Sequence, residues 1–95
     1  MAYMPASSRE ELRVPYEDAG ATAFSVEIAI LPEADGEPTD GDYKTAAWDG
    51  QQAVLTIGEG SDVVLTPGVY VVWTRITTPA HRPVRRSGLL TVGKT

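Results

Sequence analysis

The chain has 95 residues, with 13 acidic and 8 basic side chains and a formal net charge of −5. This length predicts one small domain, which hides roughly 60–65% of its extended surface on folding. The absence of cysteine excludes disulfides, thiolate nucleophiles and cysteine-based zinc sites. The acidic balance argues against general nucleic-acid binding, which needs a basic footprint. No apolar run reaches the roughly 18–20 residues of a membrane span and Met1–Pro5 lacks a signal-peptide pattern, so we expect cytoplasmic synthesis and no membrane partner.

The charges are unevenly distributed along the chain. All 13 acidic residues lie between Glu10 and Asp62, whereas five of the eight basic residues follow Asp62. If this separation reached opposite faces of the fold, copies of the protein would attract one another head to tail. The alternative is that the charges solvate different edges of the domain.

Residues 1–11 hold few apolar anchors and are predicted to form a flexible N-terminal arm. Ser8 and Glu11 have the spacing of a helix capping box. Pro15 removes a backbone donor, which limits any helix here to a single turn and assigns residues 12–16 to a short edge strand. We therefore expect an arm at residues 1–11, a β-sandwich domain at 12–93 and a C-terminal tail at 94–95.

The clearest alternation of apolar and polar residues covers residues 23–31. Phe24, Val26, Ile28 and Ile30 share one side, which is the period of a half-buried strand. Pro32 ends it, and an acidic loop rich in turn formers follows at residues 33–42. Further strands are expected at residues 43–48, 53–57, 62–65, 69–77 and 84–92.

Three dipeptides mark turns and irregularities between these strands. Asp49-Gly50 predicts a type I′ hairpin, in which both central residues need a positive φ. Ser87-Gly88 predicts a β-bulge within the last strand. Pro67-Gly68 turns the chain into the strand at 69–77, and Tyr70 follows at the place where immunoglobulin-like sandwiches bond a tyrosine hydroxyl to upstream backbone.

About seven short strands with turns every eight to twelve residues predict an all-β fold. We expect an immunoglobulin-like sandwich of two antiparallel sheets. A small closed β-barrel is the alternative, because it buries the same alternating residues and removes the sheet edges.

The sequence offers little catalytic chemistry. The only histidine, His81, lies in a loop between two prolines. Without cysteine, and with this one histidine, neither a Ser-His nor a Cys-His arrangement has support. We therefore predict a non-enzymatic protein without a cofactor.

The acidic loop supplies the one candidate metal site. Carboxylates within eight residues of each other, with glycines between them, offer hard oxygen ligands for Ca²⁺. The loop lacks the spacing of an EF-hand, and Pro38 stiffens it, so a solvated loop is the alternative. The candidate ligands are Asp35, Glu37, Asp40 and Asp42.

Several side chains are candidates for contacts with other molecules. Trp48 and Trp73 are candidates for stacking on sugars, with packing in the core or between subunits as the alternative. The basic stretch near the C-terminus would clamp a carboxylate or phosphate, or protect an edge strand from pairing. The predicted interaction residues are Tyr3, Met4, Arg9, Leu12, Trp48, Arg82, Arg85 and Arg86.

Three segments together resemble a known group of proteins. They are Ala47–Gly58, the stretch Leu65–Ile76 that reads LTPGVYVVWTRI, and the stretch Pro83–Val92 that reads PVRRSGLLTV. This pattern resembles the small β-sandwich proteins that tailed phages of actinobacteria encode among their capsid, neck and tail genes. Six arginines against two lysines and the absence of asparagine agree with a GC-rich genome.

The resemblance implies a virion structural protein, made in the host cytoplasm and present in many copies on the capsid surface, at the neck or on the tail. It implies capsid, neck or tail subunits as partners. From the predicted arm and the uneven charge we expect docking through the arm and the charged edges. Two other functions stay open: a glycan- or host-surface-binding module, and a free cytoplasmic binding or adaptor domain.

Overall fold

The computed structural model of the protein describes residues 2–5, 9–16, 19–58, 60–61, 63–78 and 83–93. Within these ranges the fold is all-β, as expected, and contains no α-helix and no helix with the length and apolar character to cross a membrane. The strands are β1 Ala2–Pro5, β2 Arg9–Pro15, β3 Ser25–Pro32, β4 Lys44–Asp49, β5 Gln52–Gly58, β6 Gly68–Thr77 and β7 Val84–Gly93. Three short 3₁₀ helices join them: η1 Ala19–Ala23, η2 Glu33–Asp35 and η3 Asp40–Asp42.

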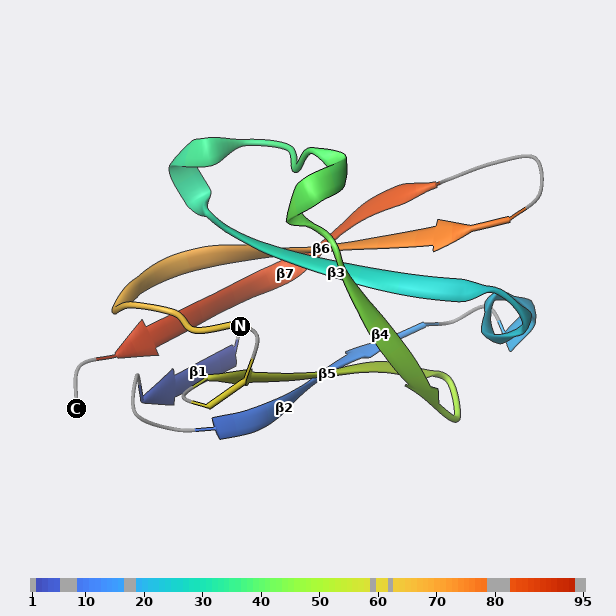
Figure 1. The fold of residues 1–95 in the computed structure, drawn as a ribbon, viewed down its shortest axis with the longest axis horizontal. Helices are drawn as coiled ribbons and strands as arrows, with labels where there is room; N and C mark the ends of the chain where they lie inside the picture. The colour runs from blue at the N-terminus through green and yellow to red at the C-terminus, as the bar shows by residue number, and fades with distance from the viewer. Residues whose placement is uncertain are drawn as a thin grey trace.

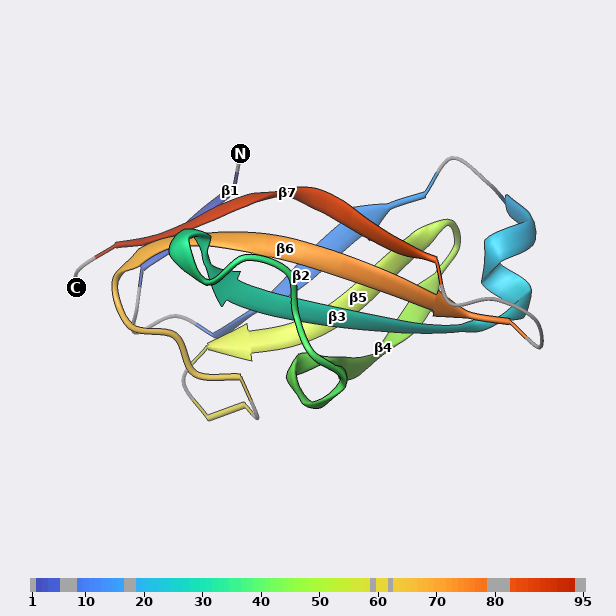
Figure 2. The same cartoon turned by 90° about the horizontal axis from the view of Figure 1, so that it is seen from above.

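The strands form one continuous sheet in the order β1-β7-β6-β3-β4-β5-β2. Every neighbouring pair is antiparallel except β1 with β7. The sheet curls into a half-barrel, with β3, β6 and β7 in one half and β2 and β5 in the other (Figures 1 and 2). β4 joins the halves, because its residues 44–46 pair with β3 and its residues 47–49 pair with β5. The expected two-sheet immunoglobulin-like sandwich is therefore not confirmed, and the described strands do not close into a barrel.

The core fills the concave side of the curled sheet. The alternation expected in β3 puts Val26 and Ile28 there, and both are fully buried. Each such aliphatic side chain contributes roughly 1.5–3 kcal/mol when it leaves water. Phe24, expected on the same side, precedes β3 and is 38% exposed. The core residues are Val14, Val26, Ile28, Ala53, Ile57, Leu65, Tyr70, Val72, Ile76, Leu90 and Val92.

The turn into β6 confirms one expected contact and corrects one expected strand. The Tyr70 hydroxyl donates a hydrogen bond of 2.7 Å to the Thr66 carbonyl. The strand expected at residues 62–65 is wrong for residues 63–65, which have no strand pairing, and Asp62 lies outside the described residues. The reason is the Ser61 hydroxyl, which donates to the Gly58 carbonyl and accepts from the Val63 amide, and so holds a turn.

The hairpin between β4 and β5 forms where expected but with a different turn. Asp49 pairs with Gln52, so Gly50 and Gln51 are the central residues. Gly50 has a φ of 61°, and no residue other than glycine has a positive φ in the described ranges. A positive φ at the first central position alone is the pattern of a type II′ turn, so the type I′ prediction is wrong.

The N-terminal segment also differs from expectation. Instead of a flexible arm over residues 1–11, the described part contains strand β1, which lies beside β7, and the first three residues of β2. The edge of β7 carries backbone groups that need partners, and β1 satisfies those at residues 90–93. β2 lies at the end of the sheet, which confirms the edge position predicted from Pro15.

A second layer covers the convex side of β3 and β6. The loop with η2 and η3 folds across it (Figure 1), and Arg75 is 8% exposed beneath the loop. Arg75 Nε lies 3.0 Å from Glu27 Oε1, and its Nη1 lies 2.6 Å from Asp40 Oδ1. Its guanidinium also lies 4.1 Å from the centre of the Tyr43 ring. This cluster fixes the acidic loop to the sheet.

Candidate functional site

The half-barrel leaves an opening between β2 and β7, which we call the seam. β7 pairs with β6 from Val84 to Val92, whereas β1 pairs with β7 only from Leu90 to Gly93. Residues 84–89 of β7 therefore have no strand partner on their outer edge within the described part of the chain. An unpaired edge of this kind is a template for another strand.

The seam contains a groove that reaches the core. It has a volume of about 310 Å³, and the core residue Val72 forms part of its wall. One side comes from residues 12–15 of β2, and the other from residues 87–89 of β7. Leu12, a predicted interaction residue, therefore lies at the groove, where a partner strand would cover apolar surface.

Arg85 bridges the seam with its side chain. Its Nη2 donates a hydrogen bond of 3.3 Å to the Pro15 carbonyl, and its guanidinium lies 4.5 Å from the centre of the Tyr16 ring. Paired strands lie about 4.8 Å apart and bond through their backbones. Because a long side chain makes this contact instead, β2 and β7 are too far apart here to pair.

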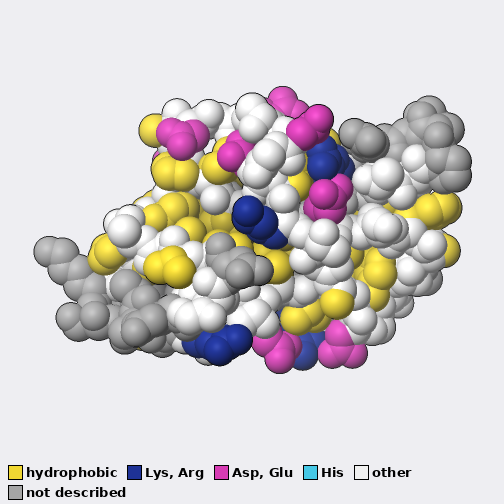
Figure 3. Space-filling model, in the orientation of Figure 1, with side chains coloured by type: hydrophobic (Ala, Val, Ile, Leu, Met, Phe, Trp, Pro, Cys, Tyr) yellow, Lys and Arg dark blue, Asp and Glu magenta, His cyan; other side chains and the backbone are white. Residues whose placement is uncertain are grey.

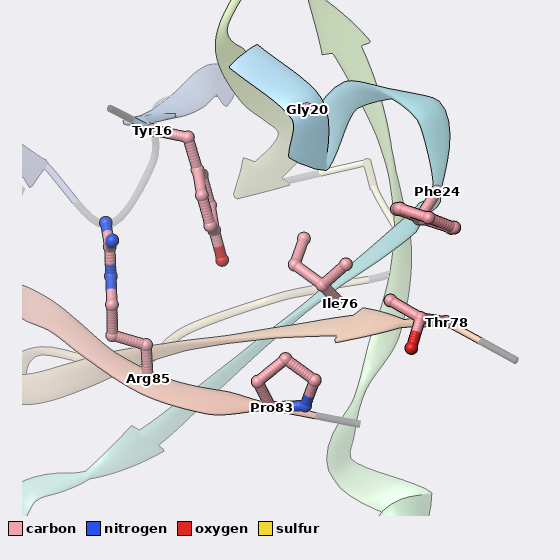
Figure 4. A pocket seen from close by; sticks show the side chains of 7 residues that line it. All are labelled: Tyr16, Gly20, Phe24, Ile76, Thr78, Pro83 and Arg85. Atoms are coloured by element: carbon pink, nitrogen blue, oxygen red, sulfur yellow. The ribbon is translucent and has the colours of Figure 1, made fainter. Parts of the chain in front are cut away.

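A second hollow, which we call the aromatic pocket, opens at one end of the seam (Figure 4). Its volume is about 470 Å³. The described lining is mostly apolar, and Arg85 is the one charged side chain among these described residues. The lining residues are Tyr16, Gly20, Phe24, Ile76, Thr78, Pro83 and Arg85.

Trp48 holds two walls of this pocket in place. Its indole Nε1 donates a hydrogen bond of 2.8 Å to the Phe24 carbonyl. Its ring meets Tyr16 edge to face, with 5.3 Å between centroids and 81° between planes. Trp48 and Trp73 are both half-buried, and the two contacts of Trp48 are those of a packed side chain.

A β-bulge shapes the edge of β7 at the seam, as the sequence predicted. Val72 pairs with Gly88 and Trp73 pairs with Arg86, which leaves Ser87 as the extra residue. The Ser87 hydroxyl lies 2.9 Å from that of Thr74, which is fully buried. Bulges interrupt strand pairing and add local twist, so this one sets how the free edge faces the seam.

The two strands that border the seam differ in charge. On β2, Arg13 contacts Asp49 at 2.7 Å and Glu11 at 2.9 Å, and the hydrogen bond to Asp49 is the main cause that raises the pKa of Arg13. On β7, Arg85 and Arg86 are exposed, and neither belongs to an ion pair in the described ranges. The β7 edge is therefore the more basic one, which favours an acidic partner.

The four candidate carboxylates of the acidic loop do not lie together. Asp40 pairs with Arg75, and Asp42 accepts hydrogen bonds from the amide and hydroxyl of Thr39. Asp35 and Glu37 are exposed. No three His, Cys, Asp or Glu side chains of the described residues come together in a group that could hold a metal ion.

The acidic side chains of this loop lie at the top of the molecule in Figure 3. Arg75, from the basic last third of the chain, lies among them. The separation of charge along the sequence therefore does not become a clean separation of faces.

The other predicted interaction residues are scattered. Tyr3 and Met4 belong to β1 and pair with Thr91 and Val92, and Arg9 is exposed at the start of β2. Arg82 and His81 lie outside the described residues. The sequence did not single out Tyr16, Phe24 or Pro83 as interaction residues, although they line the aromatic pocket. Aromatic residues just beyond the ends of two strands were the available signal for the first two.

No protein-family model, curated protein or solved structure matches the chain. The candidate site therefore depends on the geometry described above.

Proposed function

We propose that this protein is a non-enzymatic structural component of a phage virion, which docks on capsid, neck or tail subunits through the seam. The observation that carries the proposal is the unpaired edge of β7 at residues 84–89, beside a groove that opens to the core. The sequence resemblance supplies the virion context, and the seam supplies a docking surface. In this proposal β1 is the ordered part of the N-terminal segment, and it borders the docking edge.

Strand addition is the mode of docking that fits the seam. An extended segment of a neighbour would bond to the backbone of β7 and lay its alternate side chains into the groove. Each backbone hydrogen bond adds only about 0.5–1.5 kcal/mol net. A second contact of the same docked copy, for example through β1, would form at high effective concentration and so strengthen a modest strand contact.

The partner segment should be acidic. Arg85 and Arg86 follow one another on the free edge, and both are exposed. Carboxylates of an incoming segment would form charge-assisted hydrogen bonds with these guanidinium groups. Complementary charge of this kind also selects the partner and its register.

We also propose that the curled sheet is a variant of the immunoglobulin-like sandwich, in which β4 links the two halves. The support is the Tyr70 hydroxyl bond to Thr66, which has the form of the tyrosine corner of that fold.

Mass spectrometry of purified virions from the phage or prophage that encodes the chain tests the proposal. We expect the protein in washed particles at a fixed ratio to a major structural protein. Detection only in the soluble fraction of the host, and never in particles, would contradict it.

The docking surface is tested with two single-cysteine variants, since the chain has no cysteine of its own. Arg86→Cys on the β7 edge and the control Glu33→Cys on the convex loop each receive a bulky maleimide label. The labelled Arg86→Cys protein should fail to enter particles that lack the wild-type chain, whereas the labelled Glu33→Cys protein should enter. Equal incorporation of both would refute docking at the seam.

A further inference from the structure

We propose that the aromatic pocket receives an aromatic side chain of the partner protein, and that Arg85 binds a carboxylate next to that side chain. The inference rests on the proposed function and names the chemistry that the seam recognises. The partner motif would be an Asp or Glu adjacent to a Phe, Tyr or Trp.

The size and lining of the pocket support the aromatic half of this motif. The pocket volume of about 470 Å³ lies within the range of known ligand-binding pockets and leaves room for one large ring. Tyr16, Phe24, Ile76 and Pro83 surround the space in Figure 4. Aromatic side chains bury roughly 150–250 Å² each, which makes them the usual anchors of interfaces.

Arg85 supports the acidic residue of the proposed partner motif. Its guanidinium carries five N–H donors, and the described contact to the Pro15 carbonyl comes from Nη2 alone. The Tyr16 ring, 4.5 Å away, holds the guanidinium plane at the pocket wall. None of the described residues that line the pocket is acidic, so among them Arg85 has no counter-ion, and a carboxylate of the partner would supply one. Planar guanidinium groups bind carboxylates through two parallel hydrogen bonds.

The pocket is organised before a partner arrives. Trp48 contacts both Tyr16 and the Phe24 carbonyl, so one hydrogen bond and one edge-to-face contact fix two walls. Preorganised walls lower the ordering cost of binding.

Continuity with the seam favours a protein segment over a free small acid. Pro15 lines the groove, and the next residue, Tyr16, lines the pocket. Across the seam, residues 87–89 line the groove and Arg85 lines the pocket. A strand added along β7 would therefore carry one of its side chains to the pocket.

The test titrates the full-length ¹⁵N-labelled protein with acetyl-Asp-Phe-amide and follows amide, indole and arginine Nε signals by NMR. Acetyl-Asn-Phe-amide removes the charge at constant shape, and acetyl-Asp-Ala-amide removes the ring. Two variants accompany it: Arg85→Gln, and the control Lys44→Gln, which removes an exposed cation on β4. Unchanged dispersion of the spectra shows that both variants remain folded.

We expect saturable shifts of the Trp48 indole and Arg85 Nε signals, with a Kd on the order of 1 mM for so small a probe. Arg85→Gln and the Asn probe should each weaken binding roughly tenfold, the Ala probe should not bind, and Lys44→Gln should change nothing. Equal binding of the Asp and Asn probes, or no shift at these signals, would overturn the inference. Tighter binding of free 3-phenylpropionate than of the dipeptide would also overturn it, in favour of a small acid.

This outcome is separable from that of the proposed function. Absent probe binding, with labelled Arg86→Cys protein still excluded from particles, would refute the pocket alone. Probe binding by a protein that is never found in virions would refute the virion proposal alone.

Discussion

The two strands that border the seam show how differently one sheet can treat its free edges. β2 pairs with β5 on one side along residues 9–15 and is free on the other, its Arg13 is paired with acidic neighbours, and its Pro15 lacks an amide donor. β7 leaves residues 84–89 unpaired on one side, carries two exposed arginines and contains a bulge. Proline, charged side chains and bulges are all ways in which proteins protect an edge from pairing with other chains, and each of the two strands carries some of them. The comparison teaches that the two edges differ in charge: Arg13 of β2 is paired with acidic neighbours, whereas Arg85 and Arg86 of β7 have no ion-pair partner in the described ranges, so β7 is the edge that favours an acidic strand.

The largest expected effect comes from charge reversal on the β7 edge. Arg86→Glu should lower incorporation into particles roughly tenfold or more, because the new carboxylate repels an acidic partner. Glu10→Arg on β2 should leave incorporation close to wild type. Quantitative mass spectrometry of particles measures the incorporation of both variants. An equal loss of incorporation would contradict the proposed difference between the two edges.

The two edges should also differ in how much a buried or exposed valine contributes to the free energy of unfolding. Val14 of β2 is 5% exposed, whereas Val84 of β7 is 40% exposed. Val14→Ala should lower the free energy of unfolding by roughly 2 kcal/mol, through lost burial and a new cavity. Val84→Ala should change it by less than about 0.5 kcal/mol. Urea unfolding followed by tryptophan fluorescence measures both, and a large loss for Val84→Ala would mean that this edge is part of the core.

The bulge offers an intermediate effect. Thr74→Val keeps the shape of the side chain but removes the hydroxyl that lies 2.9 Å from that of Ser87. We expect a loss of about 1 kcal/mol in unfolding free energy and faster amide exchange at residues 86–88. Exchange that rises equally in β2 would show that the bulge does not shape β7 locally.

Alkaline pH should lower the stability of the fold through Tyr43, which belongs to neither of the two free edges. Burial raises the pKa of Tyr43 above its ordinary value of 10.0, although Arg75 opposes this shift. The folded state therefore holds the phenol proton more tightly than the unfolded state does. This contribution to stability is complete below pH 10 and is lost as the pH rises from 10 through the higher folded-state pKa. Urea unfolding between pH 9 and pH 12 should show this loss.

Tyr43→Phe is the matched control for that titration. It should abolish the pH-dependent loss of stability that comes from Tyr43, and at pH 7 it should cost little, because the buried Tyr43 hydroxyl has no hydrogen-bond partner among the described residues. Tyr70→Phe, which removes the bond to Thr66, should cost about 1 kcal/mol at pH 7. The reverse order at pH 7 would contradict this assignment.

The smallest effect is expected at Arg13. Its contacts with Glu11 and Asp49 are exposed, and salt screens such pairs. Arg13→Gln should barely change stability, and any difference from wild type should disappear in 1 M NaCl. A large loss that persists in high salt would show that these pairs support β2 itself.

Local patterns were enough to predict the strands that build the core. Period-two alternation located β3, the turn signals located β6, Pro15 placed β2 at an edge, and Ser87-Gly88 located the bulge. Each depends on residues close together in the chain. The Tyr70 bond to Thr66 was predictable for the same reason, since four residues separate the partners.

Long-range pairing was not predictable from the sequence. β1 lies beside β7 because it pairs with the free edge of this strand, which is almost ninety residues further along the chain. β4 joins two halves into one sheet because it changes partners midway, and no local pattern records this. Arg75 appeared as one more basic residue, although Glu27 and Asp40 hold it under a loop. The aromatic pocket was missed because Tyr16, Phe24 and Arg85 meet only after the sheet has curled.

Hydrogen–deuterium exchange of the protein, free and within particles, tests the account most directly. Docking by strand addition predicts that backbone amides in residues 84–89 exchange at least roughly tenfold more slowly in the particle, while those of residues 10–14 do not change. Protection confined to the convex loop at residues 33–42, with β7 unchanged, would contradict the account.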